Sequence, residues 1–131
     1  MLNQIVAKGL SIRTSRNKKI RGGTIMFIQN LNEMEEKEMV PGFFGRFIHT
    51  ENMTLAYWRI APGSVLPEHS HPQEQVVNLI LGTLKLTVDG TEHTLRSGSV
   101  AIIPPDVPHS GRAVTDCRVI DVFYPVRDDY K

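Results

Sequence analysis

Residues 63–82 read GSVLPEHSHPQEQVVNLILG and place His69 and His71 one residue apart. Side chains two positions apart on an extended strand point to the same face, so both imidazoles can reach one site. Gln75 has the same parity and can join them, although the intervening proline can interrupt the alternation. His109 lies far downstream and can supply a further donor from another strand. The pattern predicts a metal site that is closed by distant parts of the chain.

This set of donors, three imidazoles and one amide oxygen, is typical of transition-metal sites. It suits zinc, iron, nickel, manganese or copper better than calcium or magnesium, which prefer oxygen ligands. We therefore expect one divalent transition metal as the cofactor, and the sequence leaves the ion open. Two alternatives also stay open: Glu74 in place of Gln75 as the fourth ligand, and a polar histidine cluster that holds no metal.

Length and cysteine content indicate one domain in a reducing compartment. The chain has 131 residues, which is typical of a single domain. Cys117 is the only cysteine, so an intrachain disulfide is excluded and a cytoplasmic location is expected. No apolar run approaches the roughly 18 residues of a membrane span, so no membrane partner is expected.

Basic residues concentrate at the start of the chain. Residues 1–25 hold six Lys or Arg side chains and no acid, which leaves nine basic and 14 acidic residues in 26–131. The mildly acidic domain expected at 26–131 is therefore not predicted to bind nucleic acid. For the extension at 1–25, three interpretations stay open: an arm for nucleic acid or membrane surfaces, a transit-like segment, or a flexible or non-native extension.

Most of the chain after residue 40 reads as short β-strands. A short helix is predicted before them, over 30–39, with an asparagine cap and a Pro-Gly pair at its end. Asp89-Gly90 is the clearest turn signal and favours a type I′ hairpin. Many short strands separated by turns indicate a barrel or a two-sheet sandwich. The predicted strands are 53–61, 75–81, 84–88, 91–95, 100–103 and 116–124.

Two stretches resemble the two sequence motifs of the cupin family. The first motif spans 63–82 and has a glycine at each end, a His-x-His pair and a glutamine. The second spans 98–113, begins with glycine, and carries a proline and the Pro-His pair of His109. Asp106 and Ala113 depart from the motif, in which Gly and Asn are usual. Both departures concern turn geometry and packing rather than chemistry.

The resemblance covers about residues 40–127 and implies an all-β fold. This fold is the cupin jelly-roll β-barrel, or double-stranded β-helix, in which two sheets enclose a cavity. The resemblance also implies His69, His71, Gln75 and His109 as the metal ligands. It further indicates a homodimer, formed by strand exchange or by sheet packing.

The C-terminal residues 116–130 resemble the end of the KdgF-like cupins of pectin and alginate breakdown. These proteins also carry the His-x-His-Pro-x-Glu-Gln form present at 69–75. Their activity converts Δ4,5-unsaturated uronates into linear keto-uronates. Carried over residue by residue, the resemblance implies Asp121, Phe123 and Arg127 as active-site positions.

The chemistry of these three side chains agrees with an acidic sugar substrate. Asp121 and Phe123 share a parity on the last strand, so Asp121 can move protons where Phe123 lies against a sugar ring. Arg127 offers a bidentate fork for the uronate carboxylate. Neutral ligands leave a divalent metal its full charge, which favours Lewis-acid chemistry over oxygen activation. Each residue also has an alternative, purely structural interpretation: Asp121 as the partner of a buried group, Phe123 as plain core, and Arg127 as an ion-pair residue.

For the strand predicted over 53–61, the sequence does not decide which side chains face the cavity. Either Tyr57 and Arg59 or Trp58 and Ile60 face the cavity, and in the first case Arg59 is a second candidate clamp for the substrate. Two further histidines are expected on exposed strands or loops, His49 and His93.

These observations predict a metal-dependent isomerase that acts on unsaturated uronates in the cytoplasm. A cupin dioxygenase or another sugar isomerase is the first alternative. A non-catalytic module that binds a metal or a sugar is the second. The three hypotheses share the metal site and differ in the reaction that it supports.

Overall fold

The computed structural model describes residues 18–19 and 25–131. Most of the basic extension predicted at 1–25 lies outside the described residues, and its boundary with the domain stays a prediction. None of the helices described has the length and hydropathy of a membrane span. The chain divides into two compact units, Met1–Glu35 and Glu36–Lys131. The first contains an antiparallel pair, β1 (Lys18–Lys19) and β2 (Ile25–Met26).

The helix predicted over 30–39 is wrong. In its place, Leu31–Glu33 form a single 3-10 turn, η1, and the side chain of Asn30 caps it by accepting a backbone hydrogen bond at 3.0 Å. Lys37–Val40 form strand β3, because they pair with β4 (Phe43–His49) across a tight turn. Pairing with a neighbouring strand here overrides the local helix preference.

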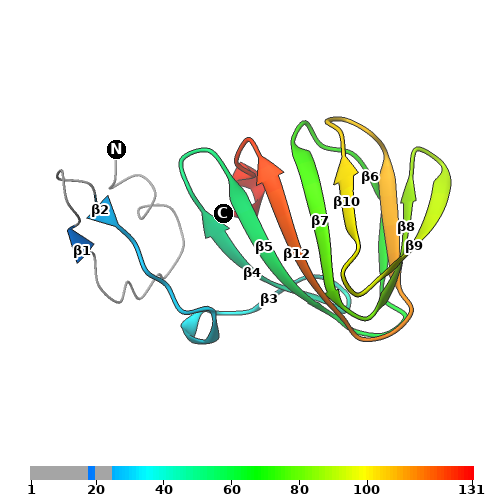
Figure 1. Ribbon diagram of the computed structural model, residues 1–131, viewed down its shortest axis with the longest axis horizontal. Helices are drawn as coiled ribbons and strands as arrows, with labels where there is room; N and C mark the ends of the chain where they lie inside the picture. The colour runs from blue at the N-terminus through cyan, green and yellow to red at the C-terminus, as the bar shows by residue number, and fades with distance from the viewer. Residues whose placement is uncertain (1–17, 20–24) are drawn as a thin grey trace. The chain divides into compact units, whose positions relative to one another are not determined.

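Glu36–Lys131 fold into two antiparallel sheets around a common core (Figure 1). After β3 and β4, the elements are β5 (Thr54–Ile60), β6 (Val65–His69), β7 (Glu74–Leu81), β8 (Thr83–Val88), β9 (Thr91–Arg96), β10 (Val100–Ile103), β11 (His109–Ala113), β12 (Cys117–Tyr124) and the 3-10 turn η2 (Asp128–Tyr130). The larger sheet has the order β10-β7-β12-β5-β4-β3, and the smaller has β6-β11-β8-β9. Strands far apart in sequence therefore lie side by side, which confirms the predicted jelly-roll barrel.

Sequence patterns locate most of these strands. The six predicted strands are all present, and the ends of each differ from the prediction by at most one residue. Asp89 and Gly90 have φ angles of 47° and 79°, which confirms the predicted hairpin between β8 and β9. The patterns do not identify β3, β4, β6 or β11. Strands β6 and β11 contain a proline and a glycine, respectively, which weaken a strand pattern.

Asp106 shows why the second motif usually carries glycine at this position. Its φ angle is 63°, in the left-handed region that disfavours most side chains but that aspartate tolerates. The backbone N–H of Asp106 donates to the carbonyl oxygen of His71 at 2.8 Å. This turn therefore ties the second motif to the first at the predicted metal site.

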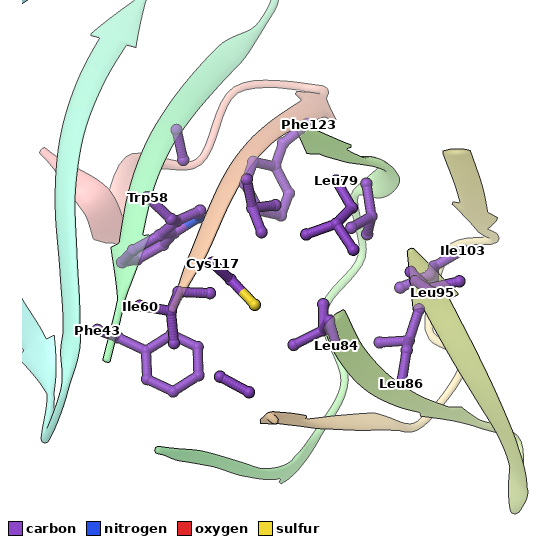
Figure 2. Close-up of a cluster of buried hydrophobic side chains, with 14 of the residues drawn as sticks. Phe43, Trp58, Ile60, Leu79, Leu84, Leu86, Leu95, Ile103, Cys117 and Phe123 are labelled. Carbon is purple, nitrogen blue, oxygen red and sulfur yellow. The ribbon is translucent and has the colours of Figure 1, made fainter. Parts of the chain in front are cut away.

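Side chains from both sheets meet in one apolar core (Figure 2). Trp58, Leu79 and Phe123 come from the larger sheet, and Leu84 and Leu86 from the smaller one. Alternating burial along β5 and β12 directs every second side chain into this core. The same alternation decides which polar side chains reach the interior.

Gly82 joins β7 to β8 in a conformation that requires glycine. Its φ angle is 103°, and a Cβ atom there would collide with the carbonyl oxygen of Asp116 and lie 2.9 Å from Sγ of Cys117. We expect Gly82→Ala to lower the free energy of unfolding by more than about 3 kcal/mol, because strain and collision add. Urea denaturation monitored by circular dichroism measures this change.

Gly63→Ala is the matched control for this experiment. Gly63 has a φ angle of 80°, but nothing lies within 4 Å of its Cβ position. The variant should lose only the backbone strain, about 1–2 kcal/mol. Equal losses in the two variants would show that collision with Asp116 and Cys117 is not what requires glycine at position 82.

Candidate metal centre

Three histidine side chains converge in the barrel. His69 ends β6, and His109 begins β11 directly opposite it in the antiparallel register. His71 follows in the loop that leads to β7. The ligand atoms of the three rings all lie within 4.8 Å of one another, close enough for one ion to bridge them.

The structure brings His71 to the site for a different reason from the one predicted. His71 does not continue the strand of His69, because β6 ends at His69. Its loop is held by two hydrogen bonds, from the N–H of Asp106 to the carbonyl oxygen of His71 and between Nδ1 of His71 and the carbonyl oxygen of Gln73. Loop hydrogen bonds rather than strand alternation therefore aim this ring.

Each of the three rings contacts a backbone carbonyl through Nδ1. A carbonyl oxygen only accepts, so Nδ1 carries the proton in each ring and Nε2 keeps a free lone pair. The atom of each histidine that is free to bind a metal is therefore Nε2. The carbonyl partners, at 2.8 to 3.0 Å, are Pro67 for His69, Gln73 for His71 and Val107 for His109.

Burial favours the neutral form of two of these imidazoles, His71 and His109. It lowers the pKa of His71 and lowers that of His109 to about 4, with the charge of Arg127 acting in the same direction on both. Neutral imidazole is the form that binds a metal. In addition, Nε2 of His109 is buried without a hydrogen-bond partner. A metal ion would satisfy this lone pair, so the residues present fit the expected cofactor.

Gln75 offers the fourth donor. It is buried on the inner face of β7, and its Oε1 lies 3.0 Å from Nε2 of His71. With the proton of His71 on Nδ1, both of these atoms are acceptors, and a cation shared between them removes their repulsion. Glu74, the alternative ligand, is exposed on the opposite face of β7, so the geometry favours Gln75.

A cavity of about 210 Å³ opens beside this cluster. The volume is below the roughly 300–1,000 Å³ of pockets for drug-sized ligands, so the cavity suits a small molecule. His69, Gln75, His109 and Asp121 supply most of its polar groups. The apolar and aromatic lining comprises Met39, Val40, Phe43, Trp58, Ile60, Leu66, Val77, Leu84, Leu86, Val119, Phe123 and Tyr130.

Asp121 is the buried carboxyl group of this cavity. The indole N–H of Trp58 donates to Oδ2 at 2.9 Å, whereas Oδ1 has no partner with hydrogen-bond geometry. Burial raises the pKa of Asp121 to about 7, against the opposing effects of Gln75, Trp58 and Arg127. A carboxyl group that titrates near neutral pH can both accept and donate a proton, as acid–base catalysis requires.

Trp58 and Ile60 form the inward-facing pair on β5, which resolves the alternative left open by the sequence. Arg59 faces the other side, where it pairs with Glu36 at 2.5 Å and covers the ring of Phe44, so its assignment as a second clamp is wrong. The role of Trp58 as the partner of Asp121 has no motif in the sequence. Its parity with Ile60 is the signal that places it inside.

Phe123 and Arg127 lie next to each other at the edge of the site. Phe123 is 1% exposed, lines the cavity and packs edge-on against His71, with ring centroids 5.5 Å apart. Arg127 is 6% exposed, so it is not a surface residue. Its guanidinium lies 4.9 Å from the ring centroid of Phe123 and 4.0 Å from that of Tyr130. Both of these rings line the cavity, and the guanidinium of Arg127 lies directly behind them.

The two remaining histidines differ from each other. His93 is exposed on β9, as expected. The expected exposure of His49 is wrong, because its ring is half-buried against Phe47 and its Nδ1 lies 2.8 Å from Oγ1 of Thr54. Pairing of β4 with β5 places His49 opposite Thr54 and so removes it from solvent.

Comparisons with known proteins agree with this geometry. A family model described as "Cupin domain" matches residues 56–123. Protein SchB of Streptomyces halstedii is 35% identical over 66 residues, which make up 50% of this chain and 48% of SchB. The chain spans about half the length of the curated relatives it matches.

Solved structures share the barrel. KdgF from Halomonas sp. is 25% identical and superposes with a TM-score of 0.72, covering 76% of this chain and 94% of KdgF. Salicylate 1,2-dioxygenase from Pseudaminobacter salicylatoxidans is 16% identical, with a TM-score of 0.63 over 66% of this chain and 27% of the dioxygenase. At that identity, the dioxygenase shows the shared fold alone.

The proposed ligands are tested by metal titration of the purified chain. We expect one divalent ion to bind, and His109→Ala to weaken binding more than about 100-fold, because loss of a direct ligand exceeds the effect of an outer partner. Gln75→Glu should keep or tighten binding, since a carboxylate adds negative charge. Isothermal calorimetry with Ni²⁺ measures these affinities.

His93→Ala is the control, because His93 is exposed on β9. It should bind Ni²⁺ as the wild type does. Equal affinity in His93→Ala and His109→Ala would contradict the assignment of the ligands.

Proposed function

The chain belongs to the cupin family, and we propose that it is a metal-dependent isomerase that opens Δ4,5-unsaturated uronates into linear keto-uronates. The observation that carries this proposal is the position of Asp121. Asp121 has one oxygen without a hydrogen-bond partner, and it lines the cavity together with His69, Gln75 and His109. A proton-transfer group and a Lewis-acid site in one small cavity suit an isomerisation of a small molecule.

The four neutral ligands define what the metal contributes. A divalent ion held by His69, His71, Gln75 and His109 would keep its full charge and polarise a sugar oxygen as a Lewis acid. The same charge attracts an anionic substrate.

Asp121 moves the protons of the reaction. Opening the ring and converting the enol to a ketone transfers a proton from oxygen to carbon and requires no oxidant. A carboxyl group with a pKa of about 7 can accept the first proton and return the second near neutral pH. Trp58 holds Oδ2 of this group, so Oδ1 remains for the reacting atoms.

The substrate class is supported by the cavity and by its neighbour Arg127. A volume of about 210 Å³ suits one sugar ring rather than a polymer. Phe123 lines this space, and the adjacent Arg127 supplies a cation for a carboxylate. The 25% identity to KdgF supports the same choice.

The activity is tested by the loss of ultraviolet absorbance from the conjugated double bond of unsaturated galacturonate. We expect turnover by the metal-loaded wild type, and Asp121→Asn should lower kcat by about 10² to 10⁴, the usual contribution of acid–base catalysis. His93→Ala should retain full activity. Equal rates in Asp121→Asn and wild type would contradict the role of Asp121.

The two alternative functions give other results in the same preparation. Oxygen consumption by the iron-loaded protein, measured with an oxygen electrode, would favour a dioxygenase. Tight metal binding without turnover of either galacturonate- or mannuronate-derived substrates would favour a non-catalytic module. Either result would overturn the proposed isomerase.

We also propose that the protein forms a homodimer through the outer face of the larger sheet. This face carries large apolar side chains that are more than half exposed on adjacent strands β10, β7 and β12. Exposed apolar patches of this kind mark interaction surfaces. The side chains are Ile80 (55%), Val100 (61%), Ile102 (66%) and Tyr124 (57%).

Charges at the two ends of this face favour a second copy as the partner. Glu74 lies beside Tyr124 at one end, and Arg118 lies beside Arg59 at the other. The carboxylate of Asp116 lies 4.0 Å from Nη1 of Arg118, at the outer limit of an ion pair. A two-fold axis through the centre of the face would bring Arg118 of each copy to Glu74 of the other.

Sedimentation velocity tests the dimer. We expect the wild type to sediment as a dimer and Ile102→Lys to sediment as a monomer, because a buried unpaired charge opposes association. Val65→Lys is the matched control, since Val65 is 53% exposed on β6 of the smaller sheet. A monomeric wild type, or a dimeric Ile102→Lys variant, would contradict this interface.

A further inference from the structure

We infer that Asp129 and Tyr130 are positioning residues that hold Arg127 so that one edge of its guanidinium is reserved for the carboxylate of the substrate. This inference rests on the proposed function, in which the substrate is an acidic sugar. It adds two residues of the turn η2 to the site and gives each a role that acts through Arg127.

Asp129 occupies one edge of the guanidinium. Nε of Arg127 donates to Oδ1 of Asp129 at 2.9 Å, and Nη2 donates to Oδ2 at 2.6 Å. Two parallel hydrogen bonds of this kind fix the plane of the fork as well as its position. The side chain of Asp129 is 60% exposed, so it is accessible to substitution without opening the core.

Tyr130 and the backbone restrict the remaining freedom of Arg127. The guanidinium lies 4.0 Å from the ring centroid of Tyr130, and that ring packs against Phe47 and Phe123 at 5.0 and 5.6 Å. The backbone N–H of Arg127 donates to the buried Oγ1 of Thr54 at 2.9 Å. The side chain is therefore held by contacts on its fork, its face and its backbone.

The other edge of the guanidinium lacks a hydrogen-bond partner of regular geometry, although the side chain of Tyr130 interacts with Arg127. Nη1 of Arg127 is buried without a hydrogen bond, in a side chain that is only 8% exposed. Buried charged donors are nearly always paired, so this N–H points to an anionic ligand that completes it. Phe123 lines the cavity and contacts the guanidinium, so this ring and that of Tyr130 stand between the cavity and Arg127.

The carboxylate of Asp129 also lowers the electrostatic cost of placing the guanidinium of Arg127 near the candidate metal site. The charge of Arg127 reaches His71 and His109, so it would repel a divalent ion that these residues hold. The carboxylate of Asp129 offsets part of this repulsion. Without it, Arg127 is free to turn away from the metal, and the substrate carboxylate loses its partner.

Trp58 provides a binding assay that does not depend on turnover. It is the only tryptophan of the chain, and its ring lies 6.2 Å from that of Tyr130. We expect Asp129→Asn to raise the Kd of metal-loaded protein for saturated D-galacturonate by about tenfold, the value of one charge-assisted hydrogen bond. Binding of neutral galactose should not change. Titration of tryptophan fluorescence measures both.

Two variants separate positioning from a merely structural role. Asp129→Glu should recover most of the lost affinity, because it keeps the carboxylate. Asp128→Asn is the neighbouring control, since Asp128 is 81% exposed and pairs with Lys131, and it should bind galacturonate as the wild type does. Unchanged or tighter galacturonate binding by Asp129→Asn would overturn the inference.

Turnover of unsaturated galacturonate distinguishes this failure from failure of the proposed function. In Asp129→Asn we expect KM to rise by about tenfold with little change in kcat, because Asp129 acts on binding through Arg127. A wild type that binds galacturonate in an Asp129-dependent way but turns over no unsaturated uronate would support the inference and overturn the proposed function. A fall in kcat with constant KM would overturn the inference alone.

Discussion

The site depends on three short hydrogen bonds between an imidazole Nδ1 and a nearby backbone carbonyl. His69 and His109 each use the carbonyl two residues earlier, and His71 uses the one two residues later. Because each contact is local, the ring orientation and tautomer are set by a short segment of chain. The pairing of β6 with β11 then brings the already oriented rings of His69 and His109 together. The remaining chemistry of the cavity follows from three Nε2 lone pairs that face one point.

Burial acts in opposite directions on the two kinds of group in the cavity. It lowers the pKa of His109 to about 4 and raises that of Asp121 to about 7. In both cases burial opposes the charged form. The result is two neutral imidazoles, those of His71 and His109, in the same interior as a carboxyl group whose pKa lies near neutral pH. One apolar barrel interior therefore favours both the candidate metal site and the candidate acid–base group.

The sequence predicts the features that depend on local pattern and leaves out those that depend on pairing. Alternation and turn residues locate most strands, and Asp89-Gly90 gives the hairpin correctly. The helix predicted over 30–39 fails because β4 recruits part of that segment into the larger sheet. Trp58 as the partner of Asp121 and Asp129 as the partner of Arg127 have no sequence signature. They arise from register and from a C-terminal turn, which no pattern encodes.

The central claim is that three Nε2 atoms and one glutamine oxygen bind a single divalent ion. X-ray absorption spectroscopy of the protein reconstituted with Ni²⁺ and dialysed tests this claim most directly, because imidazole rings give a characteristic outer scattering that can be counted. We predict one ion per chain with three imidazole nitrogens and at least one oxygen in its coordination shell. A folded protein that returns from dialysis without metal, or an ion with fewer than three imidazoles, would contradict the account.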